Sequence, residues 1–375
     1  MRKIALYLVF ALAVLPASGS KRVTVVELEK FVTSSHGKGD SKVAQQLKGL
    51  ELTERLSEVK LSSLRTAVPG LESQQALSQL ADQSEFLEVP RAEIPAKAEP
   101  AIAQQQEMVT KAVNWAAVTL RRMPNLFATR NTTRFEDTPA VLQQGVAESM
   151  SGVFTPYQPL HVVNKASVAV MYRDGKEVPQ PEPEQPASSS PAPGLSTSGE
   201  FGPILPTVLE DLENGKVTWN HWETDADGGE AAFRYTVAKE HSHFQLEFCC
   251  TEQRAFRKFA GYHGEITIRS SDGAILRMTL IADLSKSDPV TKAQIMVEFK
   301  SVAFGQEKYV CPVRSISLLE APEDLLHRVQ VPDQAPGVHH GAPVDDGSRD
   351  RAPLQIMMNE VQFDHYDLTL SGAGY

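Results

Sequence analysis

One feature of the sequence restricts the possible folds of this chain more than any other: many of its segments alternate apolar and polar residues. Successive side chains of a strand point to opposite faces of a sheet, so this alternation is typical of strands that bury one face. Short turns join most of the segments, and Asp272-Gly273 is a hairpin signal between two of them. The pattern predicts strands at 126–136, 161–172, 216–223, 230–239, 242–250, 262–270, 274–283, 293–303, 308–319 and 355–369.

The first part of the chain has a different, helical pattern. Thr24 to Glu27 fits a capping box, and apolar residues at helical spacing follow, among them Val43 with Leu47 and Leu52 with Leu56. Residues 88–101 contain three prolines among charged residues and read as a linker before a last helix through Met108 and Leu120. The sequence therefore predicts an α+β fold, with an N-terminal helical region followed by a large curved antiparallel sheet that resembles a half-barrel.

Composition divides the chain further. Residues 179–199 contain six prolines and a serine cluster, and such a segment cannot bury enough apolar surface to fold. We expect a helical region at 20–121, the first part of the β domain at 122–178, a disordered insertion at 179–199 and the rest of the β domain at 200–371. Residues 321–352, rich in Pro, Asp, Gly and His, are expected to form an exposed loop within it.

Residues 1–19 have the pattern of a secretory signal peptide. Arg2 and Lys3 precede an apolar run at 4–15, and Ala17-Ser18-Gly19 supplies small residues for cleavage. A membrane anchor is the alternative, but a twelve-residue helix is only about 18 Å long, shorter than the hydrocarbon core of a bilayer. We therefore expect a secreted protein, in the periplasm or outer envelope if the source has two membranes, with no membrane span after cleavage.

The net charge of −10 argues against a nucleic-acid partner, because binding phosphates needs a basic surface. An oxidising compartment would allow a disulfide among Cys249, Cys250 and Cys311. Cys249 and Cys250 point to opposite faces if they lie on a strand, and Cys250 shares the apolar face with Phe248, so Cys250 with Cys311 is the favoured pair. Three reduced, buried cysteines are the alternative.

Part of the chain resembles the half-barrel of the bacterial lipoprotein carriers, the LolA/LolB and RseB-like proteins. The resemblance rests on the segment from Val168 to Lys176, on Gly264 to Thr279 with its Asp-Gly turn, and on the strand around Tyr309 to Val313, and it covers about two thirds of the chain. The whole chain is also similar to an uncharacterised family of secreted bacterial proteins in which helices precede such a sheet. The resemblance implies a concave apolar cavity for acyl chains or a hydrophobic segment.

A curved sheet must cover its apolar face, and two coverings are possible. The face may enclose a lipid, lipopeptide or lipoprotein ligand, or the chain's own helices may fill it, leaving a scaffold that contacts an envelope protein. The residues expected on this face are Phe244, Leu246, Phe248, Ile266, Ile268, Leu276, Met278 and Leu280.

Catalytic chemistry has little support in the sequence. His241 and His243 are two apart on an expected strand and could share a metal, but two solvated histidines are the simpler interpretation. The chain contains no serine nucleophile elbow, phosphate-binding loop or zinc-protease motif. We expect a noncatalytic protein without a cofactor, and a metal-dependent hydrolase that uses the two histidines is the remaining alternative.

Overall fold

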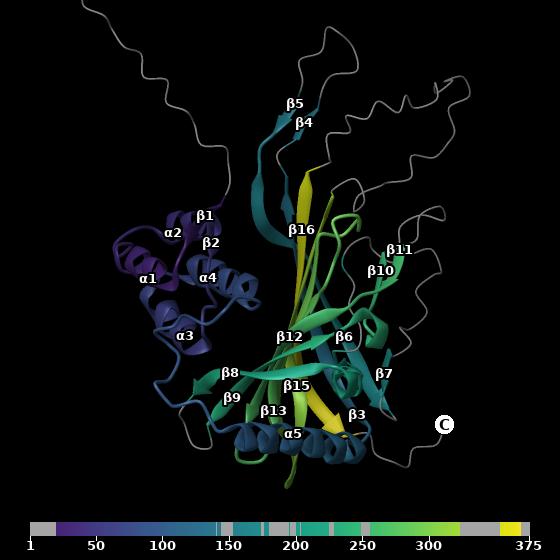
Figure 1. Ribbon diagram of the computed structural model, residues 1–375. Coiled ribbons are helices and arrows are strands. Elements are labelled where there is room, and N and C mark those ends of the chain that lie inside the picture. Colours follow the sequence, from purple (N-terminus) through teal and green to yellow (C-terminus); the bar gives the residue numbers. More distant parts are fainter. Residues whose placement is uncertain are drawn as a thin grey trace, which may run out of the picture.

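In the computed structural model a ten-stranded sheet stands beside a separate bundle of short helices (Figure 1). The structure describes residues 20–139, 141–143, 153–173, 176–179, 195, 200–202, 204–224, 229–248, 256–322 and 353–368. The expected signal peptide and Cys249 and Cys250 lie outside these ranges. So do nearly all of the insertion at 179–199 and the loop expected at 321–352, although β15 continues to Pro322.

All neighbouring strands of the large sheet pair antiparallel, in the order β7-β6-β3-β16-β15-β14-β13-β12-β9-β8, and the sheet does not close. The last strand, β16, lies between β3 and β15, so the two parts of the β domain on either side of the insertion form one sheet. The strands are β3 (Leu126–Thr138), β6 (Gln158–Arg173), β7 (Lys176–Pro179), β8 (Lys216–Thr224), β9 (Glu230–Val237), β12 (Tyr262–Arg269), β13 (Ile275–Ala282), β14 (Lys292–Phe304), β15 (Glu307–Pro322) and β16 (Leu354–Leu368).

These bounds confirm the predicted α+β fold with a curved antiparallel sheet, and nine of the ten predicted strands lie in that sheet, whose outermost strand, β7, was not predicted. The segment predicted at 242–250 is not part of the large sheet, because β10 (Gln245–Phe248) pairs with β11 (Phe256–Phe259) in a separate ribbon. Another ribbon joins β4 (Val141–Gln143) to β5 (Val153–Thr155). The Asp272-Gly273 hairpin joins β12 to β13 as predicted, with Gly273 at a φ of 79°.

The helices before residue 85 form a unit with its own apolar core, which we call the helical unit (residues 21–84). Thr24 caps its first helix and forms the predicted capping box with Glu27. The helical reading was wrong at Leu52 and Leu56, since Leu52 lies in a short strand that pairs parallel with residues 21–23 and Leu56 lies in a loop. The unit contains β1 (Lys21–Val23), α1 (Val25–Thr33), α2 (Asp40–Lys48), β2 (Leu50–Leu52), α3 (Glu58–Ala67) and α4 (Leu71–Ser84).

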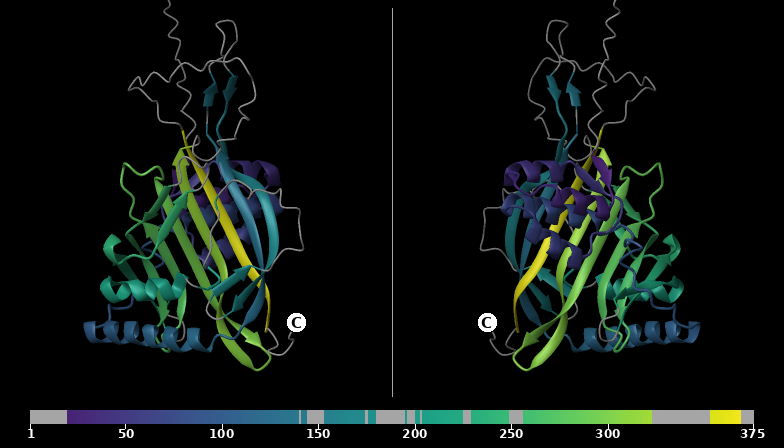
Figure 2. Two further views of the ribbon diagram at one scale, coloured as in Figure 1. Left: turned by 90° about the vertical axis from the view of Figure 1, so that its right-hand side faces the viewer. Right: turned by 90° about the vertical axis from the view of Figure 1, so that its left-hand side faces the viewer.

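Different parts of the chain cover the two faces of the sheet. The helical unit lies against one face (Figure 2, right). The opposite face packs on α5 (Ile102–Arg122) and α6 (Ile204–Asp211), and we call it the α5 face. The linker at 88–101 has no helix or strand, as predicted, and connects the helical unit to α5. No helix within the described ranges is both long and apolar enough to cross a membrane.

Candidate functional site at the interface of the helical unit and the sheet

The α5 face holds four of the residues expected to line a ligand cavity. Ile266, Ile268, Met278 and Leu280 are between 1% and 5% exposed and belong to the largest apolar cluster of the described chain. Residues of α5 and α6 fill the space above them, namely Met108, Ala112, Ala116, Leu205 and Val208. Side chains of the chain itself therefore occupy this part of the face.

The other four expected cavity residues are scattered. Phe244 packs at the edge of the same cluster, with the centre of its ring 5.9 Å from that of Tyr262. It also packs with Leu246 at the edge of a second cluster around Ala282 and Leu319. Leu276 is the extra residue where Thr267 pairs with Arg277 and Ile268 with Ile275, so a bulge takes it out of the regular alternation. The side chain of Phe248 is outside the described part of the structure.

The two histidines do not lie on a strand, so the premise that they face the same way was wrong. His241 ends a short 3-10 helix, η2 (Lys239–His241), and His243 precedes β10. His243 instead pairs through Nδ1 with Asp211, the last residue of α6, and this hydrogen bond raises the pKa of the imidazole. Within the described residues no three His, Cys, Asp or Glu side chains lie close enough together to hold a metal ion.

Cys311 forms no disulfide within the described part of the chain and is 1% exposed, in an apolar cluster with Tyr172, Phe201 and Phe363. Burial raises the pKa of this thiol to about 12. Its expected partner, Cys250, lies outside the described residues, so the proposed pairing stays a prediction.

The face of the sheet toward the helical unit carries a row of charges across three adjacent strands. Arg277 of β13 pairs in register with Glu298 of β14, which pairs in register with Arg314 of β15. Opposite charges directly across a strand pair stabilise each other. Glu298 accepts from Arg314 Nη1 at 3.0 Å, and Arg277 Nη1 lies 3.7 Å from Glu265 of β12.

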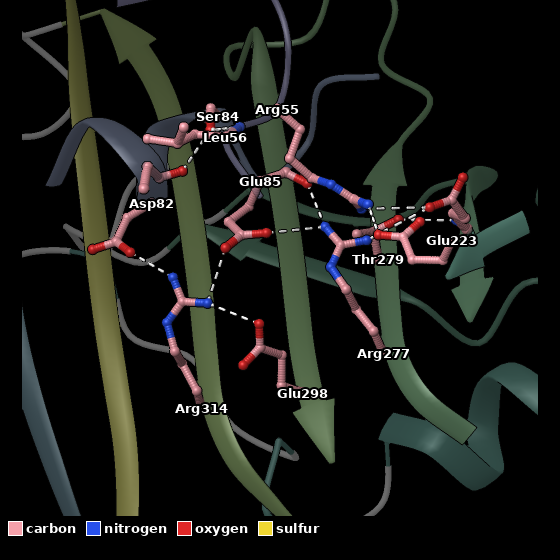
Figure 3. A network of polar contacts seen from close by, with 12 residues as sticks. Arg55, Leu56, Asp82, Ser84, Glu85, Glu223, Arg277, Thr279, Glu298 and Arg314 are labelled. Atoms are coloured by element: carbon pink, nitrogen blue, oxygen red, sulfur yellow. Dashed lines mark hydrogen bonds and ion pairs between the residues drawn. The ribbon is translucent and has the colours of Figure 1, made fainter. Parts of the chain in front are cut away.

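The helical unit meets this row at the end of α4 (Figure 3). Arg314 donates to Asp82 of α4 and, over 2.9 Å, to Glu85, the residue that follows this helix. Arg277 Nη2 lies 3.2 Å from the other oxygen of Glu85. Glu85 therefore links two arginines of the sheet to the end of one helix.

Arg55 extends the network to the far edge of the sheet. Its guanidinium pairs with Glu223 of β8 and lies 3.6 Å from Glu265. The Arg55 side chain is 6% exposed, and burial, followed by the nearby charge of Arg277, lowers its pKa. Glu223 also accepts a hydrogen bond from His221 at 2.9 Å.

Carboxylates outnumber guanidiniums in this network. Arg55, Arg277 and Arg314 face Asp82, Glu85, Glu223, Glu265 and Glu298. Burial raises the pKa of Asp82 to about 7, against the opposing effect of Arg314. Burial would also raise the pKa of Glu85, but Arg277 and Arg314 together lower it. Asp82, which has one arginine partner, therefore binds a proton more readily than Glu85, which has two.

A small apolar patch lies beside the charges. Phe86, just after the helical unit, packs against a cluster on the sheet formed by Phe135, Leu160, Met296, Ile316 and Met358. Gln79 of α4 donates to the backbone carbonyl of Leu160 at 2.6 Å. The apolar patch and the amide contact set the position of α4 on the sheet.

A cavity of about 190 Å³ remains between the helical unit and the sheet. Arg55, Glu85 and Arg277 of the network line it, together with Glu88, Arg234 and Glu265. Arginines and carboxylates of this lining already pair with one another, so the cavity suits water or a small solute of balanced charge.

This network of charges cannot be predicted from local patterns in the sequence. Its arginines and carboxylates are spread from residue 55 to residue 314, and each one alone resembles an ordinary solvated charge on the polar side of a strand or helix. The alternation around Arg277 and Arg314 marks a face but not what covers it. Comparisons with protein-family models, with curated proteins and with solved structures find no match for this chain.

Proposed function

We propose that this chain is a noncatalytic envelope interaction protein, a scaffold whose sheet is filled by its own helices. The observation that carries this proposal is the packing of Ile266, Ile268, Met278 and Leu280 beneath α5 and α6. An acyl chain could reach these side chains only by displacing both helices. Binding of a lipid or lipopeptide on this face, the first expectation from the sequence, is therefore the less favoured function.

The helical unit supports the same proposal. It has a core separate from those of the sheet, and its contact with the sheet combines ion pairs, one apolar patch and a cavity. Such a mixture is typical of interfaces between domains rather than of a continuous core. The signal peptide expected at residues 1–19 supports an envelope location for such a scaffold.

Native mass spectrometry of protein purified without detergent tests the proposal. We expect the mass of the chain without an acyl ligand, and no uptake when phospholipid or a synthetic lipopeptide is added. Cross-linking in intact cells should then capture a reproducible envelope partner that is lost on substitution of one surface residue. A stoichiometric acyl ligand in the purified protein would overturn the proposal and restore the lipid-binding function.

A further inference from the structure

The two outer strands of the sheet have different neighbours. The linker lies against β8 through a side chain of that strand, since Trp222 donates from Nε1 to the carbonyl of Ala98 at 2.9 Å and Lys97 Nζ lies 3.7 Å from the centre of the Trp222 ring. At the other side β7 is short and pairs only with Val170–Arg173 of β6. Among the described residues, no strand pairs with the outer edge of β6 before Val170.

Residues 163–169 of β6, which we call the open edge, are exposed one after another. Successive residues point to opposite faces of a sheet, so both faces of β6 are exposed to solvent along this stretch. Val163 and Val168 are 44% and 40% exposed. The unpaired N–H and C=O groups of such an edge are a template for another strand, and natural sheets usually cover or shorten edges of this kind.

We infer that the open edge pairs antiparallel with the open edge of a second copy of this chain, about a two-fold axis at Ala166. The inference rests on the proposed interaction function and names its surface and partner. A two-fold contact pairs the free edges of both copies at once, and two-fold dimers are the commonest soluble oligomers.

The limits of the open edge favour this register. At the C-terminal end of the open edge, β7 begins to pair with β6 at Val170. At its N-terminal end, a bulge at Val163 interrupts the regular pairing of β6 with β3. The free run between these limits is centred on Ala166, whose small side chain would lie on the axis. A two-fold axis normal to the sheet then places Val163 opposite Ala169 of the second copy.

Charge favours the same register. Lys165 is the one charged residue in the sequence from 163 to 169. Two copies centred on Ala166 place each Lys165 opposite Ser167, whereas a register centred one residue earlier would place the two lysines directly opposite each other, which is destabilising. A second copy can therefore add to the edge without a pair of like charges across the ladder.

Light scattering after size-exclusion chromatography tests the inference on the mature protein. We expect twice the mass of one chain at micromolar concentration. Val168→Lys adds a charge to an exposed position of the edge, and Ala166→Pro removes a backbone donor; each should raise the dimer dissociation constant at least about tenfold. Val26→Lys, on an equally exposed residue of α1, should leave the mass unchanged.

A cross-link tests the register. Cysteines opposite each other on an antiparallel pair are close enough for a disulfide, so mild oxidation of Ala166→Cys should give a covalent dimer that wild type and Val26→Cys do not form. A monomer at every concentration, a dimer unaffected by both edge variants, or a dimer that Ala166→Cys does not cross-link would overturn the inference.

The outcome is distinguishable from that of the proposed function. A lipid-free monomer would overturn only the pairing of the open edge. A dimer that carries an acyl ligand would overturn only the scaffold proposal, because the open edge does not include the α5 face. Val168→Lys should keep the circular-dichroism spectrum of wild type and still unfold in one cooperative transition, which separates a lost contact from a misfolded chain; its melting temperature should fall only by the stabilisation that dimer formation gives to wild type.

Discussion

Asp82 of α4 and Arg314 of β15 form an ion pair that joins the helical unit to the middle of the sheet. Their side chains are 6% and 18% exposed, so the pair is shielded from solvent. Replacing both partners of a shielded ion pair with apolar residues often changes stability little. Replacing only one of them is strongly destabilising, because the other charge stays buried without a partner. The packing of the helical unit on the sheet therefore requires that each charge of this network keeps its partner.

Replacing Arg314 should destabilise the protein strongly. Arg314→Met leaves Asp82, Glu85 and Glu298 without their shared cation, and we expect a loss of about 3–5 kcal/mol in the free energy of unfolding, measured in urea. Arg234→Met is the control, because Arg234 of β9 pairs with Glu88 of the linker and their side chains are 52% and 71% exposed. Its loss should not exceed about 1 kcal/mol. Equal losses in the two variants would contradict the role given to burial.

Stability should fall as the pH rises toward neutrality. Burial raises the pKa of Asp82 to about 7 and that of Asp137 to about 6, so the folded protein binds protons that the unfolded chain releases near its usual value of 3.8. The stabilisation from the protonated forms is full below pH 4 and is lost as the pH rises through 6 to 7. Asp82 faces Arg314, Glu85 and Glu360. Burial raises the pKa of Asp82 more than the charge of Arg314 lowers it, and the two glutamates raise it further.

Asp82→Asn tests this slope, because the amide resembles the protonated carboxyl at every pH. We expect its unfolding free energy to change less than that of wild type between pH 5 and 8. Asp288→Asn is the control: hydrogen bonds from Lys258 and Ser285 outweigh burial and lower the pKa of Asp288, so its contribution is lost only on acidification. A wild-type profile that rises from pH 5 to 8 would contradict the assignment.

Local signals in the sequence were enough to predict many of the elements. The capping box of Thr24 and the Asp272-Gly273 hairpin each depend on residues close together in the chain, and both are present. The ends of β6 and β16 lie within a few residues of the predicted ones.

These local signals do not predict contacts between segments that are far apart in the chain. The parallel pairing of β1 with β2 depends on residues about thirty positions apart, and Leu52 looked helical because its neighbours fit a helical spacing. Likewise, Glu85 and Arg277 meet only because α4 ends over β13. A polar residue on a strand indicates a face outside the apolar core, and the sequence does not show whether water or another domain covers it.

The hairpin between β12 and β13 should tolerate no side chain at Gly273. A Cβ there would lie 2.5 Å from the backbone carbonyl carbon of Lys111 in α5, and the φ of 79° is itself unfavourable for alanine. Gly305→Ala is the control, with a φ of 63° and open space around the Cβ. We expect Gly305→Ala to cost about 1–2 kcal/mol and Gly273→Ala at least about 2 kcal/mol more, measured by chemical unfolding. Equal costs would mean that α5 does not press on this turn.

Cys311 should resist alkylation in the folded protein. Its thiol is buried and its pKa is raised to about 12, so little thiolate forms at pH 8. We expect iodoacetamide to leave Cys311 unmodified until denaturant is added, as read by peptide mass spectrometry. The same experiment without reductant tests the pairing with Cys250: three labelled cysteines in the denatured chain mean no disulfide, and one labelled cysteine means that a pair exists. Rapid labelling of Cys311 in the native protein would contradict its burial.

Cutting the chain within the Pro/Ser-rich insertion should leave two fragments that stay together. The first fragment would contain the helical unit, α5, β3 and β6, and the second would contain the strands from β8 to β16. β3 pairs with β16 along most of its length, and α5 packs in the same apolar cluster as β12 and β13, so several interfaces hold the fragments. A specific protease site inserted after Ser189 makes the cut definite. We expect the cut protein to elute as one species under native conditions and as two in denaturant. Separation of the fragments without denaturant would mean that β3 and β6 do not belong to the same sheet as β16.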